Sequence, residues 1–103
     1  MNIFNNIPKQ LPDELINILV ASKDIRIERI VSQGQCSDPD FWYDQAENEW
    51  VIVLKGNAKL QFATNNKIIH LKEGDYISIT AHTKHRVEWT SQEVVWLAVF
   101  FLN

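Results

Sequence analysis

Several features that define whole classes of protein are missing from this 103-residue sequence. A single cysteine, Cys36, excludes an intramolecular disulfide bond and a cysteine-rich zinc site. The N-terminus lacks the basic start and the apolar core of a secretory signal peptide. No apolar run approaches the ~20 residues that cross a bilayer. We therefore expect a cytoplasmic protein that makes no use of a membrane.

Charge of one dominant sign is also absent. The formal net charge is -3, and the lysine and arginine residues are scattered along the chain. A phosphate-binding stripe needs clustered basic residues, so we expect no nucleic-acid partner. The sequence also lacks a Gly-x-Ser-x-Gly turn, a glycine-rich phosphate loop and a Cys-x-x-Cys pair. None of the reactions marked by those motifs is indicated.

Apolar residues, by contrast, are plentiful. They make up 46% of the chain, which includes four tryptophans. A chain of this length buries roughly two-thirds of its unfolded surface when it folds as one domain. We therefore expect one compact domain with a well-filled core.

The segment 11–22 is the best candidate for a helix. Pro12 suits a first helical turn, and Asp13 and Glu14 complement the positive end of a helix dipole. Apolar residues fall on one face at helical spacing, namely Leu11, Leu15, Ile18 and Leu19. We predict an N-terminal arm and helix over residues 1–24, packed on the rest of the domain.

From residue 25 onward the pattern changes to that of β-strands. Alternating or continuous apolar runs predict strands at 25–31, 42–45, 49–54, 57–63, 67–71, 76–80, 85–90 and 94–102. Short strands separated by turns are typical of a β-sandwich or barrel, which we place at residues 25–103. The last strand is apolar on both faces, which favours a homodimer that covers one face.

Two spaced pairs of residues resemble the motifs of the cupin family. Six residues separate Glu49 from Gly56, and Gly74 precedes His85 by eleven positions. The resemblance implies an all-β double-stranded β-helix, a jelly-roll barrel whose glutamate and histidine face inward, often around a divalent metal. The family's two usual histidines before the glutamate are absent. Depending on the gap, Gln45 and Tyr43, or Asp44 and Trp42, stand there instead.

Strand alternation gives the same inward direction to Glu49 and His85. His85 shares a face with Val87, while the neighbouring residues are charged. An isolated buried charge costs several kcal/mol, so the two groups must pair with each other or hold a cation. A carboxylate and an imidazole suit Zn, Mn, Fe or Ni. Asp44 and Gln45 are the candidates for further metal ligands, and a metal-free pocket is the alternative.

Other polar and aromatic residues near the motifs could line a ligand pocket. Tyr43 could offer its hydroxyl group, and Trp89 lies on the predicted inward face two positions beyond Val87. His82 lies three residues before His85, either at the barrel mouth or as a solvated loop residue. We expect His70 to be structural or exposed.

Strand 25–31 has an ambiguous charged face. Strict alternation from Ile25 and Ile27 would point Arg29 inward, whereas a bulge would release it to solvent, and we favour the bulge. Arg26 and Glu28 then belong to the solvated face.

Three functions are compatible with these residues. Cupins include dioxygenases, isomerases and lyases, so the resemblance implies a small-molecule site and is compatible with a metal-dependent enzyme. A metal-free binding or sensor module is the second hypothesis. A purely structural dimer is the third, disfavoured by the polar residues predicted to face inward.

Overall fold

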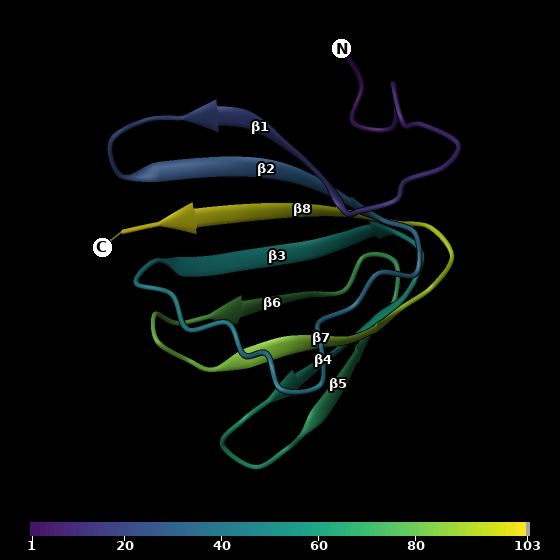
Figure 1. Cartoon of the computed structure of the whole chain (residues 1–103). Coiled ribbons are helices and arrows are strands. Elements are labelled where there is room, and N and C mark those ends of the chain that lie inside the picture. The colour runs from purple at the N-terminus through teal and green to yellow at the C-terminus, as the bar shows by residue number, and fades with distance from the viewer. Residues whose placement is uncertain (103) are drawn as a thin grey trace.

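The computed structural model describes residues 1–102, which form eight antiparallel strands in two facing sheets (Figure 1). The strands are β1 Leu15–Ala21, β2 Ile25–Ser32, β3 Asn48–Lys55, β4 Ala58–Phe62, β5 Ile68–Leu71, β6 Tyr76–Ile79, β7 His85–Thr90 and β8 Val94–Phe101. The larger sheet has the order β1-β2-β8-β3-β6, and the smaller sheet has the order β5-β4-β7. This is the all-β jelly-roll barrel that the sequence predicts. Among the described residues, no helix is long and apolar enough to cross a membrane.

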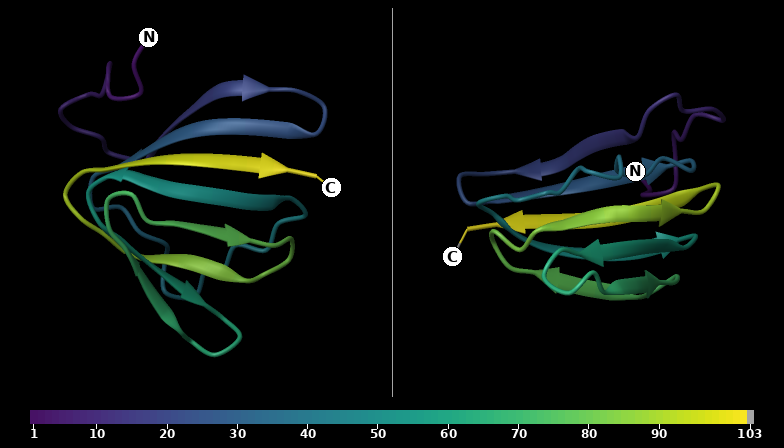
Figure 2. Two further views of the ribbon diagram at one scale, coloured as in Figure 1. Left: turned by 180° about the vertical axis from the view of Figure 1, so that it is seen from behind. Right: turned by 60° about the horizontal axis from the view of Figure 1, so that its bottom comes forward.

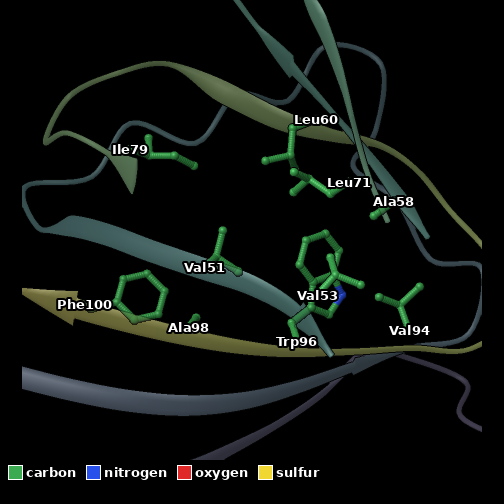
Figure 3. Close-up of a cluster of buried hydrophobic side chains, with 10 residues drawn as sticks. All are labelled: Val51, Val53, Ala58, Leu60, Leu71, Ile79, Val94, Trp96, Ala98 and Phe100. Carbon is green, nitrogen blue, oxygen red and sulfur yellow. The ribbon is translucent and has the colours of Figure 1, made fainter. Parts of the chain in front are cut away.

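The core lies between the two sheets (Figure 3). Alternate residues of the strands point into it, as the period of a β-strand requires. Its buried members are Val51, Val53, Ala58, Leu60, Leu71, Ile79, Val94, Trp96, Ala98 and Phe100. Full burial of an aliphatic side chain of this size contributes roughly 1.5–3 kcal/mol. The core therefore joins the two sheets, and half of its residues also line the cavity described below.

The predicted helix at 11–22 is wrong. Residues 15–21 form β1, which pairs with β2 from Leu15 opposite Val31 to Ala21 opposite Arg26. Three of the seven residues of β1 are isoleucine or valine, whose branched side chains fit a strand better than a helix. Pairing with a neighbouring strand overrides the weak helical pattern. The predicted boundary between residues 24 and 25 falls in the short turn between β1 and β2.

The short strand predicted at 42–45 is reduced to a single bridge. Tyr43 pairs with His85 through two backbone hydrogen bonds, of 2.7 and 3.2 Å, and the flanking residues remain irregular. Proline and several aspartates in 38–44 disfavour a longer ladder. The bridge nevertheless fixes Tyr43 beside the start of β7.

Arg29 is buried on the outer face of β2, where it holds the N-terminal segment against the sheet. Its guanidinium donates to Asn17 Oδ1 at 2.6 and 3.0 Å, and to the carbonyls of Ile3 and Asn5 at 3.1 and 2.5 Å. Figure 2 shows this purple N-terminal segment beside β1 and β2 in both views. Neither predicted position of Arg29 is correct. β2 has no bulge at this residue, so Arg29 shares a face with Ile25 and Ile27, but that face points away from the barrel interior. The bulge lies in β1, between Ile18 and Val20.

The alternation of β2 is therefore opposite to the predicted one. Arg26 and Glu28, expected on a solvated face, point into the barrel, and Ile25 and Ile27 lie on the outer face with Arg29. The reason is that both faces of this strand carry apolar and charged residues. A shift of one residue exchanges the two faces, and only contacts with other strands select between them.

Candidate functional site

A cavity of about 300 Å³ opens between the two sheets, and we call it the barrel pocket. Its walls are largely apolar, with Ile30, Val51, Leu60, Ile79, Trp96 and Phe100 among them. Its polar residues are Glu14, Arg26, Glu28, Tyr43, Gln45, Glu49 and His85. An apolar cavity with a few converging polar groups is the usual form of a small-molecule site.

Glu49 and His85 reach the barrel pocket from different sheets. Glu49 is the second residue of β3 and His85 is the first residue of β7. Glu49 Oε1 lies 3.7 Å from His85 Nε2, and both side chains are nearly buried. His85 Nδ1 lies 2.8 Å from the Thr83 carbonyl, an acceptor, so Nδ1 carries a proton and Nε2 faces the carboxylate.

This arrangement favours the charged imidazolium. Burial alone would lower the pKa of His85, but Glu49 and the Thr83 carbonyl stabilise the protonated ring and raise the pKa above its ordinary value. The raised pKa favours an ion pair between these two residues at the wall of the pocket.

Gln45 and Asp44 take opposite directions. Gln45 Nε2 donates to Glu49 Oε1 at 3.2 Å and belongs to the pocket. Asp44 turns outward, where its Oδ1 lies 2.9 Å from His82 Nδ1. His82 and Asp44 are both exposed, which places this second histidine–carboxylate pair on the loop surface. His82 accordingly lies outside the barrel pocket.

The predicted metal ligands do not form a complete set. Glu49 and His85 meet, but Asp44 faces away and Gln45 directs its amide nitrogen at Glu49. Within residues 1–102, no three histidine, cysteine, aspartate or glutamate side chains are grouped so that they could hold a metal ion. Sites for the expected transition metals normally take three or four protein ligands. The donor set therefore does not fit such a metal.

Tyr43 covers His85 at the pocket wall. The two rings stack with centroids 5.4 Å apart and planes 28° apart. Burial raises the pKa of Tyr43, and the negative charges of Glu14 and Glu49 raise it further. The phenol consequently stays protonated and can donate a hydrogen bond into the pocket.

Trp89 lies outside the barrel pocket, contrary to the prediction. Leu60 pairs with Val87, but Lys59 pairs with Trp89, so β7 contains one extra residue at Glu88. The bulge reverses the alternation after Val87, and Trp89 is 42% exposed with Lys59 Nζ 5.5 Å from its ring centroid. His70 is exposed on β5, as predicted.

Sequence reasoning missed three charged residues of the pocket. Arg26 Nε donates to Glu28 at 2.7 Å, and its two terminal nitrogens donate to Glu47 at 2.9 and 3.1 Å. Glu14 accepts a 2.8 Å hydrogen bond from Ser32. The alternation of Arg26, Glu28 and Ile30 was the available signal for β2. Glu14 gave no such signal, because the predicted helix placed it in a solvated first turn.

Comparison with known proteins decides the family. A family model described as the cupin domain matches residues 28–100. The chain belongs to the cupin family. The resemblance inferred from Glu49 with Gly56 and from Gly74 with His85 is thereby confirmed. Among curated proteins, no significant match to this cupin was found.

Solved structures include one close relative of this cupin. A candidate mannose-6-phosphate isomerase from Ralstonia eutropha JMP134 is 39% identical, with a TM-score of 0.96, over 100% of this chain and 97% of the other. A cupin superfamily protein from Desulfitobacterium hafniense DCB-2 is 17% identical, with a TM-score of 0.79, over 94% of this chain and 84% of the other.

A more distant cupin has the same fold. An RmlC-like cupin with a double-stranded β-helix from Methanocaldococcus jannaschii is 16% identical, with a TM-score of 0.73, over 93% of this chain and 86% of the other. Identities this low establish the fold alone, whereas the Ralstonia protein also bears on function.

Proposed function

We propose that this cupin binds a small polar molecule in the barrel pocket, with Glu49 and His85 as the reactive centre. One observation carries the proposal: a carboxylate and an imidazole from different sheets face each other at 3.7 Å within a largely apolar cavity. A core that served stability alone would be better filled with apolar side chains, because buried charges must recover their lost hydration.

The reaction that best suits these groups is a proton transfer of the isomerase type. Conversion of an aldose to a ketose needs a base that takes a proton from the carbon beside the carbonyl, and a donor to the carbonyl oxygen. The Glu49 carboxylate supplies the base, and the His85 imidazolium and the Tyr43 hydroxyl supply donors. The name of the Ralstonia relative supports this reaction class.

A non-catalytic binding module is the second candidate. Glu49 Oε1 already accepts from Gln45 and faces His85, so the polar centre is satisfied without a substrate. In such a module the same groups would recognise a ligand without transferring a proton.

Our proposal includes no metal. Cupins often bind divalent metals, but here Glu49 and His85 are the two predicted ligands that converge. A proton transfer between carbon atoms can proceed through general acid–base groups alone.

We also propose that the chain forms a homodimer. The doubly apolar strand that suggested it, β8, lies at the centre of the larger sheet, whereas β1 lies at its edge. The exposed apolar side chains of β1 are Ile16, Ile18, Leu19 and Val20. An edge strand of this kind can pair with its own copy about a two-fold axis. Light scattering at micromolar concentration should give twice the chain mass, and a monomeric mass would contradict the proposal.

Solvent exchange in D₂O tests the proposed chemistry. The protein is incubated with unphosphorylated aldoses and ketoses and with mannose 6-phosphate, and deuterium beside the carbonyl is followed by NMR. Enzyme-dependent incorporation should disappear in Glu49→Gln and His85→Ala and persist in the His70→Ala control. Ligand-induced spectral changes without exchange would instead establish the binding module. Equal loss in all three variants would contradict the site assignment.

A further inference from the structure

The charges of the barrel pocket are unevenly matched. It holds three carboxylates, from Glu14, Glu28 and Glu49, and two basic groups, from Arg26 and His85. His85 faces Glu49, and Arg26 is shared between Glu28 and Glu47. Within residues 1–102, Glu14 therefore has no basic partner in an ion pair. The pocket carries an excess of negative charge at the Glu14 end.

Buried hydrogen bonds hold Glu14 in place. Its Oε2 accepts from the hydroxyl of Ser32, whose own side chain is fully buried. Ser32 Oγ in turn accepts from Trp96 Nε1 at 3.2 Å. These two hydrogen bonds link the Glu14 carboxylate to the buried side chains of Ser32 and Trp96 and so fix its position.

Two pKa directions agree with this charge distribution. The pKa of Glu14 is raised chiefly by burial, partly offset by the Ser32 hydrogen bond and raised again by the charge of Glu28. The pKa of Tyr43 is raised by burial and then by Glu14 and Glu49. Burial is the first cause of both shifts, and a positive charge nearby would stabilise the ionised form of each group.

Apolar side chains form part of the pocket wall near Glu14. Ile16 and Ile30 lie side by side on paired strands, and Trp96 pairs with Ile30 on the next strand. A ligand lying between Glu14 and the Glu49–His85 pair would therefore cross a hydrocarbon surface. It needs a positive group at one end and a short apolar body.

We propose that the barrel pocket selects a small organic amine, whose ammonium group binds Glu14 and whose apolar body lies on Ile16, Ile30 and Trp96. This inference rests on the proposed small-molecule site, independently of the aldose–ketose reaction proposed for it, and specifies its ligand class. A phosphate ester would bring a charge of about -2 to a pocket whose Arg26 and His85 already face carboxylates. Phosphorylated sugars, the class named for the Ralstonia relative, are consequently poor ligands for this chain.

Three probes of nearly identical shape and different charge test the proposal. They are 3-methylbutylamine, 3-methylbutanol and 3-methylbutanoate, each titrated at neutral pH and constant ionic strength. The readout is the indole N–H resonance of Trp96, which donates into the chain that ends at Glu14. The exposed Trp89 indole, outside the pocket, is the internal reference.

The amine should shift the Trp96 resonance saturably, with a dissociation constant at least tenfold below that of the alcohol. The carboxylate should give no saturable shift. Glu14→Gln keeps the shape of the side chain and the hydrogen bond to Ser32 but removes the negative charge. The dissociation constants of the amine and the alcohol should then differ by less than threefold. Asp40→Asn removes an exposed carboxylate that does not line the pocket and should keep the preference.

Equal or stronger binding of 3-methylbutanoate would overturn the charge assignment while supporting the small-molecule site. No response to any probe would also overturn the amine proposal, and the D₂O exchange experiment would still decide the proposed function. If Glu14→Gln fails to fold, the three dissociation constants measured with the wild-type protein still test the proposal.

Discussion

Glu49 of β3 and His85 of β7 face each other from opposite sheets, with Oε1 and Nε2 3.7 Å apart. The pair links the sheets at the end of the barrel where polar groups replace the apolar core. Removal of either partner leaves the other as an uncompensated buried group. The pair therefore contributes to stability as well as to the proposed chemistry.

Stability should fall as the pH rises above neutrality. The folded pKa of His85 is raised above its unfolded value of about 6.5, so the folded state holds this proton more tightly. The contribution is complete below about pH 6.5 and is lost as the pH passes through the raised value. We expect the free energy of unfolding, measured with urea, to decrease across this range.

Glu49→Gln is the matched variant for this pH dependence. It removes the negative charge that holds the proton on His85, so the same pH change should have a smaller effect. An undiminished slope in Glu49→Gln would show that another group is responsible.

Gly56→Ala should destabilise the protein strongly. Gly56 has φ +86°, and an added Cβ would lie 2.2 Å from the backbone oxygen of Glu93. Gly34 has the same φ, but no atom lies within 4 Å of the position that an added Cβ would take. Gly34→Ala therefore measures the cost of the backbone conformation without a steric clash. We expect about 1 kcal/mol for Gly34→Ala and at least about 3 kcal/mol for Gly56→Ala by urea unfolding. Equal losses would contradict the predicted clash.

Arg29→Met should release the N-terminal segment. The variant removes the donors to the carbonyls of Ile3 and Asn5 and to Asn17, while it keeps much of the side-chain volume. We expect a loss of roughly 1–3 kcal/mol in unfolding and faster proteolysis within residues 1–14. Lys23→Met, at an exposed position, is the control. Unchanged proteolysis would refute a retaining role for Arg29.

Divalent metals should not stabilise this cupin appreciably. The protein would be dialysed against EDTA, and Zn²⁺, Mn²⁺, Fe²⁺ or Ni²⁺ would then be added to untagged samples. A ligand at 100 times its dissociation constant adds about 2.7 kcal/mol, so a tight site would be obvious in the melting temperature. We expect a change below about 1 °C. Stoichiometric metal that is lost in His85→Ala would contradict the incomplete donor set.

The barrel could be predicted from the sequence because each of its many strands carries its own signal. Each strand has its own alternation and turns, and Glu49, Gly56, Gly74 and His85 together specified the family. The helix error arose where the evidence was weakest. Residues 15–21 suit an amphipathic helix or an edge strand, and hydrogen bonding to β2 decides between them.

The site was harder to predict because it depends on register. One extra residue in β7 places Trp89 on the face opposite to the predicted one. The alternation of β2 is also opposite to the predicted one, so Arg26 and Glu28 line the pocket. Glu14 entered the site from a segment distant in sequence, held by Ser32. These positions follow from contacts between strands, which no local pattern contains.

The position of β8 at the centre of the larger sheet has a consequence for synthesis. β8 leaves the ribosome after β2 and β3, yet it joins them. Until β8 has emerged, the two halves of that sheet have no common hydrogen-bonding neighbour, and β2 and β3 expose edges that can pair wrongly. The barrel can therefore close only after β8 has been synthesised, at a rate limited by a contact between distant parts of the chain.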